Sequence, residues 1–215
     1  MKLLFRLFVL CILVFLPMKA EAKDIVLPEA GISFTVPDDW QVIADRETGE
    51  FNRVLFEKVF YFRGQNNTNR VIALCDPATG MGMIVLAADP PKNYAQLLNS
   101  MAKADQATFD AKFATIMVAK FESNFKKLSQ SRGFSANDFS MQRRPVGGVV
   151  TGVISCKLQR HDVEGEPEIQ ADSVLFMERI PGTMVDFARE RDNQTHKAVL
   201  DGIVESIRLI PKTGD

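Results

Sequence analysis

Apolar and polar side chains alternate along Ile32–Val36. This period-two pattern predicts a β-strand that turns one face toward the core. Pro37 has no backbone N–H to donate and Asp38 favours turns, so the strand is expected to stop and reverse there. Trp40, the only tryptophan, follows the turn. It is interpreted as a core residue rather than an exposed ring that stacks on a ligand, because a side chain of this size is mostly buried in folded proteins.

Further runs with strand character lie in two blocks, one before and one after a long helical stretch. Val149–Arg160 alternates apolar with polar residues, whereas Arg53–Arg63 is apolar on both faces and is expected to be an interior strand. The strands expected after Trp40 are Arg53–Arg63, Arg70–Cys75, Met83–Ala87, Phe139–Arg144, Val149–Arg160, Ala171–Arg179 and Thr183–Arg191.

The stretch Asn93–Arg132 has apolar residues at the three- and four-residue intervals of helices. Asn93 is expected to cap its start with Gln96 as partner, and the pattern breaks near Asp105 before it resumes. A closing helix is expected from Thr195. The order of strands, helix, strands and helix, without βαβ alternation, predicts an α+β sandwich in one domain, residues 23–215.

A ladder of large apolar side chains distinguishes the long helical stretch. One interpretation is that the ladder docks the helix on the sheet. The other is that part of it lines an apolar groove for a lipid or for a partner's helix. The candidate groove residues are Phe109, Phe113, Met117, Phe121 and Phe125.

Residues 1–22 have the parts of an export signal. Lys2 and Arg6 precede the apolar run Leu7–Leu16, and small residues near Ala22 fit a cleavage site. The run rises only about 15 Å as a helix, which is too short to span a bilayer. A lipoprotein signal needs a small residue before its cysteine, which is not the case at Cys11. We therefore expect a periplasmic or secreted protein that is cleaved near Ala22 and carries no lipid.

Net charge excludes one class of partner. The formal charge is −1, and it becomes −3 without residues 1–22, which hold three basic residues and one acidic residue. This mild acidity gives no footprint for nucleic acid. No later segment is apolar enough to be a transmembrane segment.

Cys75 and Cys156 remain after cleavage of the signal. An isolated pair in an oxidising compartment is a candidate disulfide, and the alternative is two buried thiols.

The sequence contains no motif of a known catalytic site. The chain has no nucleophile elbow, phosphate-binding glycine loop or dinucleotide fingerprint. His161 and His196 lie far apart in the sequence and are expected to be exposed. We assign no catalytic, cofactor-binding or metal-binding residue, and expect no enzyme.

Two segments carry a resemblance to a known group. Gly31–Trp40, with its strand ending in proline before an acidic turn and a tryptophan, resembles the start of PsbP-like and DcrB-like domains. Val199–Leu209 is similar to their terminal helix. The resemblance implies an α/β/α sandwich, with a central antiparallel sheet and helices packed on both faces. It also implies a non-enzymatic accessory or binding protein. Together with the export signal and the absence of catalytic motifs, this favours a module that binds another envelope protein. The alternative, which the apolar ladder suggests, is a carrier of a small apolar ligand or lipid in a groove beside the long helix.

Overall fold

The computed structural model describes residues 22–43, 70–130, 134–160 and 167–212. The expected export signal and the expected strand Arg53–Arg63 lie outside these ranges. The described strands are β1 (Ala22–Leu27), β2 (Ile32–Pro37), β3 (Gln41–Val42), β4 (Arg70–Cys75), β5 (Gly82–Ala87), β6 (Phe134–Val146), β7 (Val149–Arg160), β8 (Ile169–Phe176), β9 (Thr183–Glu190) and β10 (Arg208–Leu209). The described helices are α3 (Lys92–Lys103), α4 (Gln106–Thr108), the π-helix η1 (Phe109–Ala114), α5 (Thr115–Gln130) and α6 (Gln194–Ser206).

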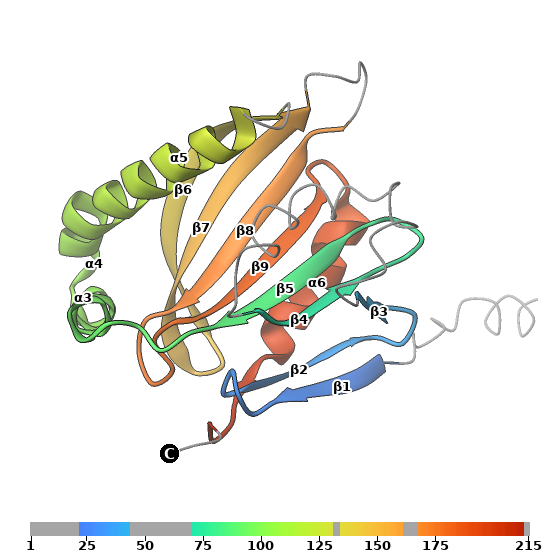
Figure 1. The fold of residues 1–215 in the computed structure, drawn as a ribbon, viewed down its shortest axis with the longest axis horizontal. Helices are drawn as coiled ribbons and strands as arrows, with labels where there is room; N and C mark the ends of the chain where they lie inside the picture. The colour runs from blue at the N-terminus through green and yellow to red at the C-terminus, as the bar shows by residue number, and fades with distance from the viewer. Residues whose placement is uncertain (1–21, 44–69, 131–133, 161–166, 213–215) are drawn as a thin grey trace, which may run out of the picture.

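A seven-stranded antiparallel sheet with the order β3-β4-β5-β9-β8-β7-β6 forms the centre of the molecule (Figure 1). The two strand blocks of the sequence meet where β5 pairs with β9, in a register that places Gly82 opposite Ala188. A smaller antiparallel sheet has the order β1-β2-β10. The chain therefore has the expected α+β sandwich with a central antiparallel sheet.

One face of the large sheet packs against the small sheet and α6. Trp40, Phe34 and Phe176 are almost fully buried in this layer, as expected for the tryptophan. Leu200 and Ile203 bring the apolar stripe of α6 into the same cluster. Burying an aromatic or branched side chain stabilises a fold by about 1.5–3 kcal/mol, so these residues fix the position of the small sheet.

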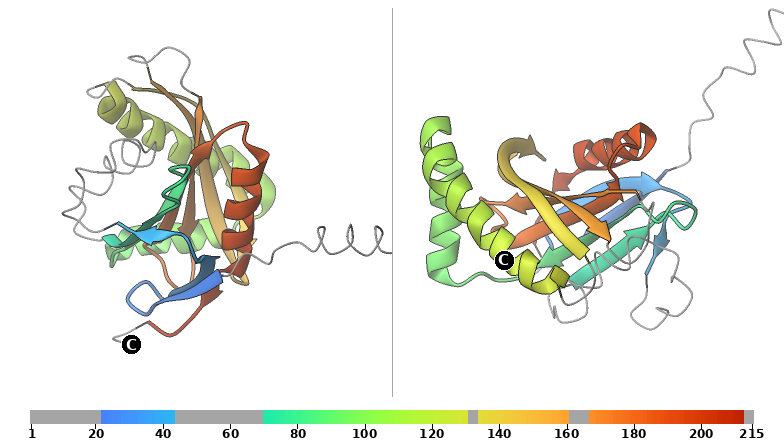
Figure 2. Two further views of the ribbon diagram at one scale, coloured as in Figure 1. Left: turned by 90° about the vertical axis from the view of Figure 1, so that its right-hand side faces the viewer. Right: turned by 90° about the horizontal axis from the view of Figure 1, so that it is seen from above.

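The opposite face of the large sheet packs against α3, η1 and α5 (Figure 2). Leu98 and Met101 of α3 and Met117 of α5 meet Ile154 and Leu175 of the sheet in a separate core cluster. The sheet thus has helices on both faces, as the resemblance implied.

Several element bounds agree with the sequence pattern. β4 and β7 have the expected bounds, and the break near Asp105 is present. α3, however, begins at Lys92 after Pro91, with no side-chain cap, so the cap expected at Asn93 is wrong. The strand β1 and the π-helix η1 were not predicted.

The candidate disulfide between Cys75 and Cys156 is absent, and the two cysteines are buried thiols, as in the alternative interpretation. Both side chains are buried on the same face of the large sheet. The register connects them along one row of residues, from β4 through β5, β9 and β8 to β7. Four strand spacings separate the two Cα atoms by about 19 Å along the sheet, whereas a disulfide needs less than about 7 Å.

Candidate functional site

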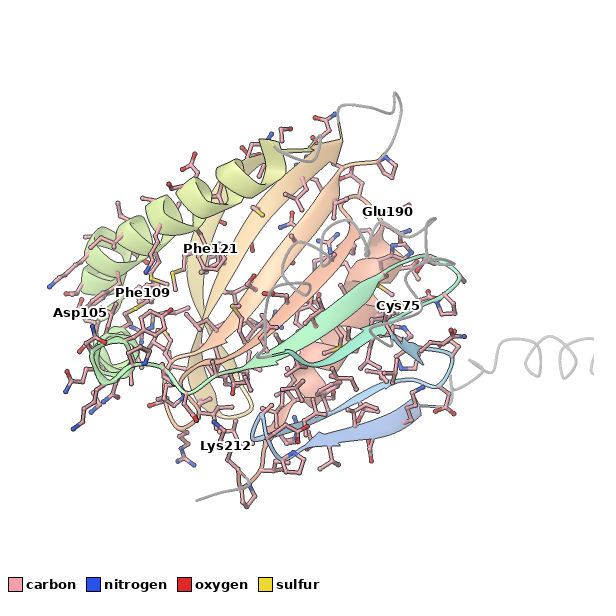
Figure 3. The ribbon with its side chains drawn as sticks, viewed as in Figure 1. Cys75, Asp105, Phe109, Phe121, Glu190 and Lys212 are labelled. Carbon is pink, nitrogen blue, oxygen red and sulfur yellow. The ribbon has the colours of Figure 1, made fainter. Side chains whose placement is uncertain are left out.

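The candidate site is the helical layer, defined as α3, α4, η1 and α5. Asp105 forms the corner between its two arms (Figure 3). One carboxylate oxygen accepts a hydrogen bond from the backbone N–H of Thr108 at 2.7 Å, and the other accepts one from the Thr108 hydroxyl at 3.0 Å. These bonds favour the ionised carboxylate and hold the pKa of Asp105 below its usual range.

Arg143 of β6 connects this corner to the sheet. Its guanidinium donates a hydrogen bond to the carbonyl oxygen of Ala104 and lies 5.4 Å from the centre of the Phe109 ring. A cation over an aromatic face contributes about 0.5–2 kcal/mol. Sequence reasoning missed this role of Arg143, because Ala104 is 39 residues away and no local pattern links the two.

The π-helix η1 follows the corner. The hydroxyl of Thr115 donates to the carbonyl oxygen of Asp110, five residues earlier, at 3.3 Å. Short π-helical turns of this kind are often found at functional sites.

The candidate groove residues divide between the core and its border. Phe109 is fully buried and Met117 is 4% exposed, whereas Phe113 and Phe121 are half-buried. Figure 3 shows Phe109 and Phe121 between the helical layer and the sheet. The side chain of Phe125 lies outside the described part of the structure. The described members therefore pack toward the sheet.

The outer surface of the helical layer carries apolar side chains that sequence reasoning had not singled out. Leu97 of α3 is 38% exposed and Ile116 of α5 is 58% exposed. The ammonium group of Lys120 lies 5.8 Å from the centre of the Tyr94 ring, which joins the two helices. Leu97 follows Tyr94 by about one turn of α3, and Ile116 precedes Lys120 by about one turn of α5, so each apolar side chain lies on the same side of its helix as its partner in this contact. We call Tyr94, Leu97, Ile116 and Lys120 the α3–α5 seam.

The titratable groups of the described residues do not converge on a reaction centre. No group of three or more histidine, cysteine, aspartate or glutamate side chains within the described ranges could hold a metal ion. His196 is buried on α6, so its expected exposure is wrong; its Nδ1 lies 4.0 Å from a carboxylate oxygen of Glu190. Burial, together with the carboxylate of Asp76, raises the pKa of the Cys75 thiol to about 11, which keeps it protonated and a poor nucleophile at neutral pH.

Comparisons with known proteins identify the fold. No protein-family model matches the chain, and no curated protein matches it. Among solved structures, the chain is similar to cyanobacterial PsbP (CyanoP) from Synechocystis sp. PCC 6803, in a solution structure. The TM-score is 0.58 at 15% identity, and the match covers 88% of this chain and 93% of that chain. The fold is therefore PsbP-like, as the resemblance of Gly31–Trp40 and Val199–Leu209 predicted, while the likeness to DcrB-like domains stays a prediction.

Among the helices that the structure describes, none combines the length and the apolar composition needed to cross a bilayer.

Proposed function

We propose that the protein is a non-catalytic, exported accessory module that binds another envelope protein through the α3–α5 seam. The exposure of Leu97 on α3 and of Ile116 on α5, each about one turn from the Tyr94–Lys120 contact between the two helices, carries this proposal. The PsbP-like fold and the lack of a catalytic motif in the sequence support it.

The helical layer already has a packed core of its own. The buried side chains of the helical layer, such as Leu98 and Met101, pack on the sheet, so the layer needs no further apolar residues for its own stability. Large apolar side chains that lie together on a surface mark interaction sites more often than isolated ones do. The other two large apolar side chains exposed in the described residues, Val26 and Val42, lie on strands at the ends of the two sheets.

The apolar side chains and the charge of the seam favour a helical partner. An exposed apolar surface can accept the apolar face of a partner's helix. Lys120 belongs to the seam and Lys112 lies four residues before Ile116, and their ammonium groups lie near the Tyr94 and Phe113 rings. We expect the partner helix to carry acidic side chains beside its apolar face.

A double variant tests the proposal. Leu97→Asp with Ile116→Asp places two carboxylates on the seam without touching the core, and Val26→Asp is the matched control, because Val26 is 59% exposed on β1. Purification from envelope extract should recover a stoichiometric partner with the natural protein and with the Val26 variant. The double variant should keep its circular dichroism spectrum and lose that partner. Retention of the partner by the double variant would reject the seam as its binding site.

The alternative, a carrier of a small apolar ligand, stays a prediction from the sequence. Phe109 and Met117, two of its expected lining residues, belong to the core. Native mass spectrometry of the purified protein tests it, since a carrier should show a co-purifying lipid mass.

A further inference from the structure

A second surface feature lies far from the helical layer in the sequence. An open pocket of about 470 Å³ lies between the turn that joins β6 to β7 and the last turn of α6. Figure 1 shows this turn beside the end of α6 that leads into β10. The volume is within the range of sites that bind small molecules, about 300–1,000 Å³.

Two glycines form the turn that lines this pocket. Gly147 and Gly148 have φ values of 60° and 80°, which other residues rarely adopt and which suit a two-residue hairpin turn. A Cβ atom on Gly147 would lie 3.3 Å from the carbonyl oxygen of Ile207, so the turn packs closely on the end of α6. A Cβ atom on Gly148 would have no heavy atom within 4 Å, so that side of the turn faces open space.

Two guanidinium groups from different elements line the pocket. Arg208 uses one terminal nitrogen to donate to the carbonyl oxygens of Glu205 and Ile207, at 2.6 and 2.8 Å. The carbonyls at the end of α6 therefore hold this side chain in place, and its other N–H groups make no hydrogen bond within the described residues.

The second guanidinium, that of Arg144, is only loosely paired. It lies 3.7 Å from a carboxylate oxygen of Asp201, while the other oxygen of the same carboxylate accepts a hydrogen bond from Lys197 at 2.5 Å. Lys197 thus neutralises Asp201, and the charge of Arg144 remains available to a ligand.

The remaining lining decides the class of ligand. Val146 and Val204 are buried and give the pocket an apolar part. The carboxylate of Glu205 lies on the exposed border, so the two arginines exceed it by one positive charge. This net positive charge attracts an anion, and the two buried valines beside it favour an anion that carries an apolar part.

From this arrangement we infer that the pocket binds a carboxylate attached to an apolar body, whose oxygens are bound by Arg144 and Arg208 and whose apolar part contacts Val146 and Val204. Planar guanidinium groups bind carboxylates through paired hydrogen bonds. A free organic acid and the C-terminus of a peptide with an apolar last residue present the same chemistry.

Titration of the full chain with octanoate, followed by ¹H–¹⁵N NMR, tests the inference. The amides of Gly147 and Gly148 should shift in a saturable way. Octyltrimethylammonium, which has the same tail and the opposite charge, should leave them unchanged. Arg144→Gln and Arg208→Gln should each weaken binding by about three- to fivefold, as expected for partly exposed ion pairs. Glu205→Gln should strengthen it, and Lys112→Gln, on η1, should have no effect.

A second pair of probes separates the two sources of the carboxylate. A short peptide that ends in leucine is titrated beside its C-terminal amide. If the acid peptide binds more tightly than octanoate, the result indicates a protein terminus as the ligand. If it binds more weakly than octanoate, the result indicates a free acid. Equal shifts with octanoate and octyltrimethylammonium, or no shift with any carboxylate, would overturn the inference. A Glu205→Gln variant that binds octanoate more weakly would also overturn it, even if the arginine variants fold poorly.

Discussion

Gly182 occupies the turn that leads into β9 in a conformation that other residues resist. Its φ is 93°, and a Cβ atom there would lie 2.2 Å from the carbonyl oxygen of Ala88. Because backbone atoms cannot move aside as a flexible side chain can, Gly182→Ala should lower the free energy of unfolding by about 2 kcal/mol or more. Urea denaturation measures the change.

Gly202 is the matched control for this prediction. It lies in α6, and a Cβ atom there would have no heavy atom within 4 Å. Since alanine is a better helix former than glycine, Gly202→Ala should raise the free energy of unfolding by about 0.5–1 kcal/mol. Equal effects of the two substitutions would contradict the described position of the turn.

The buried thiol of Cys75 should make the protein less stable at alkaline pH. Its pKa is raised to about 11 in the folded protein, so the folded state favours the protonated thiol. The stabilisation is complete below the pKa of the unfolded chain, near 9, and is lost as pH rises toward 11. Between these values the natural protein should lose about 2 kcal/mol more than the Cys75→Ala variant does. Equal losses in denaturation series at pH 8.5 and 11 would show that the thiol is not buried.

At the scale of elements, the corner between α3 and α4 depends on the carboxylate of Asp105. Asp105→Ala removes both bonds to Thr108 and should lower the melting temperature at pH 7, whereas Asp105→Asn keeps a capping oxygen and should lower it less. Because the pKa of Asp105 is lowered in the fold, its charge stabilises the protein above the unfolded pKa of about 3.9 and stops doing so as pH falls.

The measurement for this prediction is thermal melting by circular dichroism at pH 7 and pH 3. The difference between the natural protein and Asp105→Asn should shrink at the lower pH. A difference that grows on acidification would contradict the proposed role of the charge.

The predictability of each element follows from what its residues contact. β7 was predicted with its correct bounds because one face of the strand is buried, which imposes alternation on the sequence, and β4 because it is a short apolar run between a polar turn and Asp76-Pro77. β1 was missed, because it begins at Ala22, in the region interpreted as a cleavage site. The π-helix η1 was missed as well. Phe109 and Phe113 are four residues apart, as in an α-helix, whereas the buried residues of η1 are Phe109 and Ala114, five apart.

At the scale of the molecule, hairpins were predictable and strand order was not. Local turns indicate which strands pair in sequence, but the pairing of β5 with β9 brings together segments about a hundred residues apart. The choice between a disulfide and two thiols was open for this reason: two inward-facing cysteines share a face, yet four strand spacings separate them. The carboxylate pocket was equally unpredictable, because Arg144 and Arg208 meet only when α6 packs beside the turn after β6.

The central claim is that the buried side chains of the helices and sheets form the core, while the exposed side chains of the α3–α5 seam bind a partner. Site-specific photo-crosslinking in the native envelope tests it most directly. A photoreactive residue in place of Leu97 or Ile116 should give one discrete adduct of the same mass, and the same residue in place of Ala198, exposed on α6, should give none. Adducts of equal yield from all three positions, or an adduct from position 198 alone, would contradict the account.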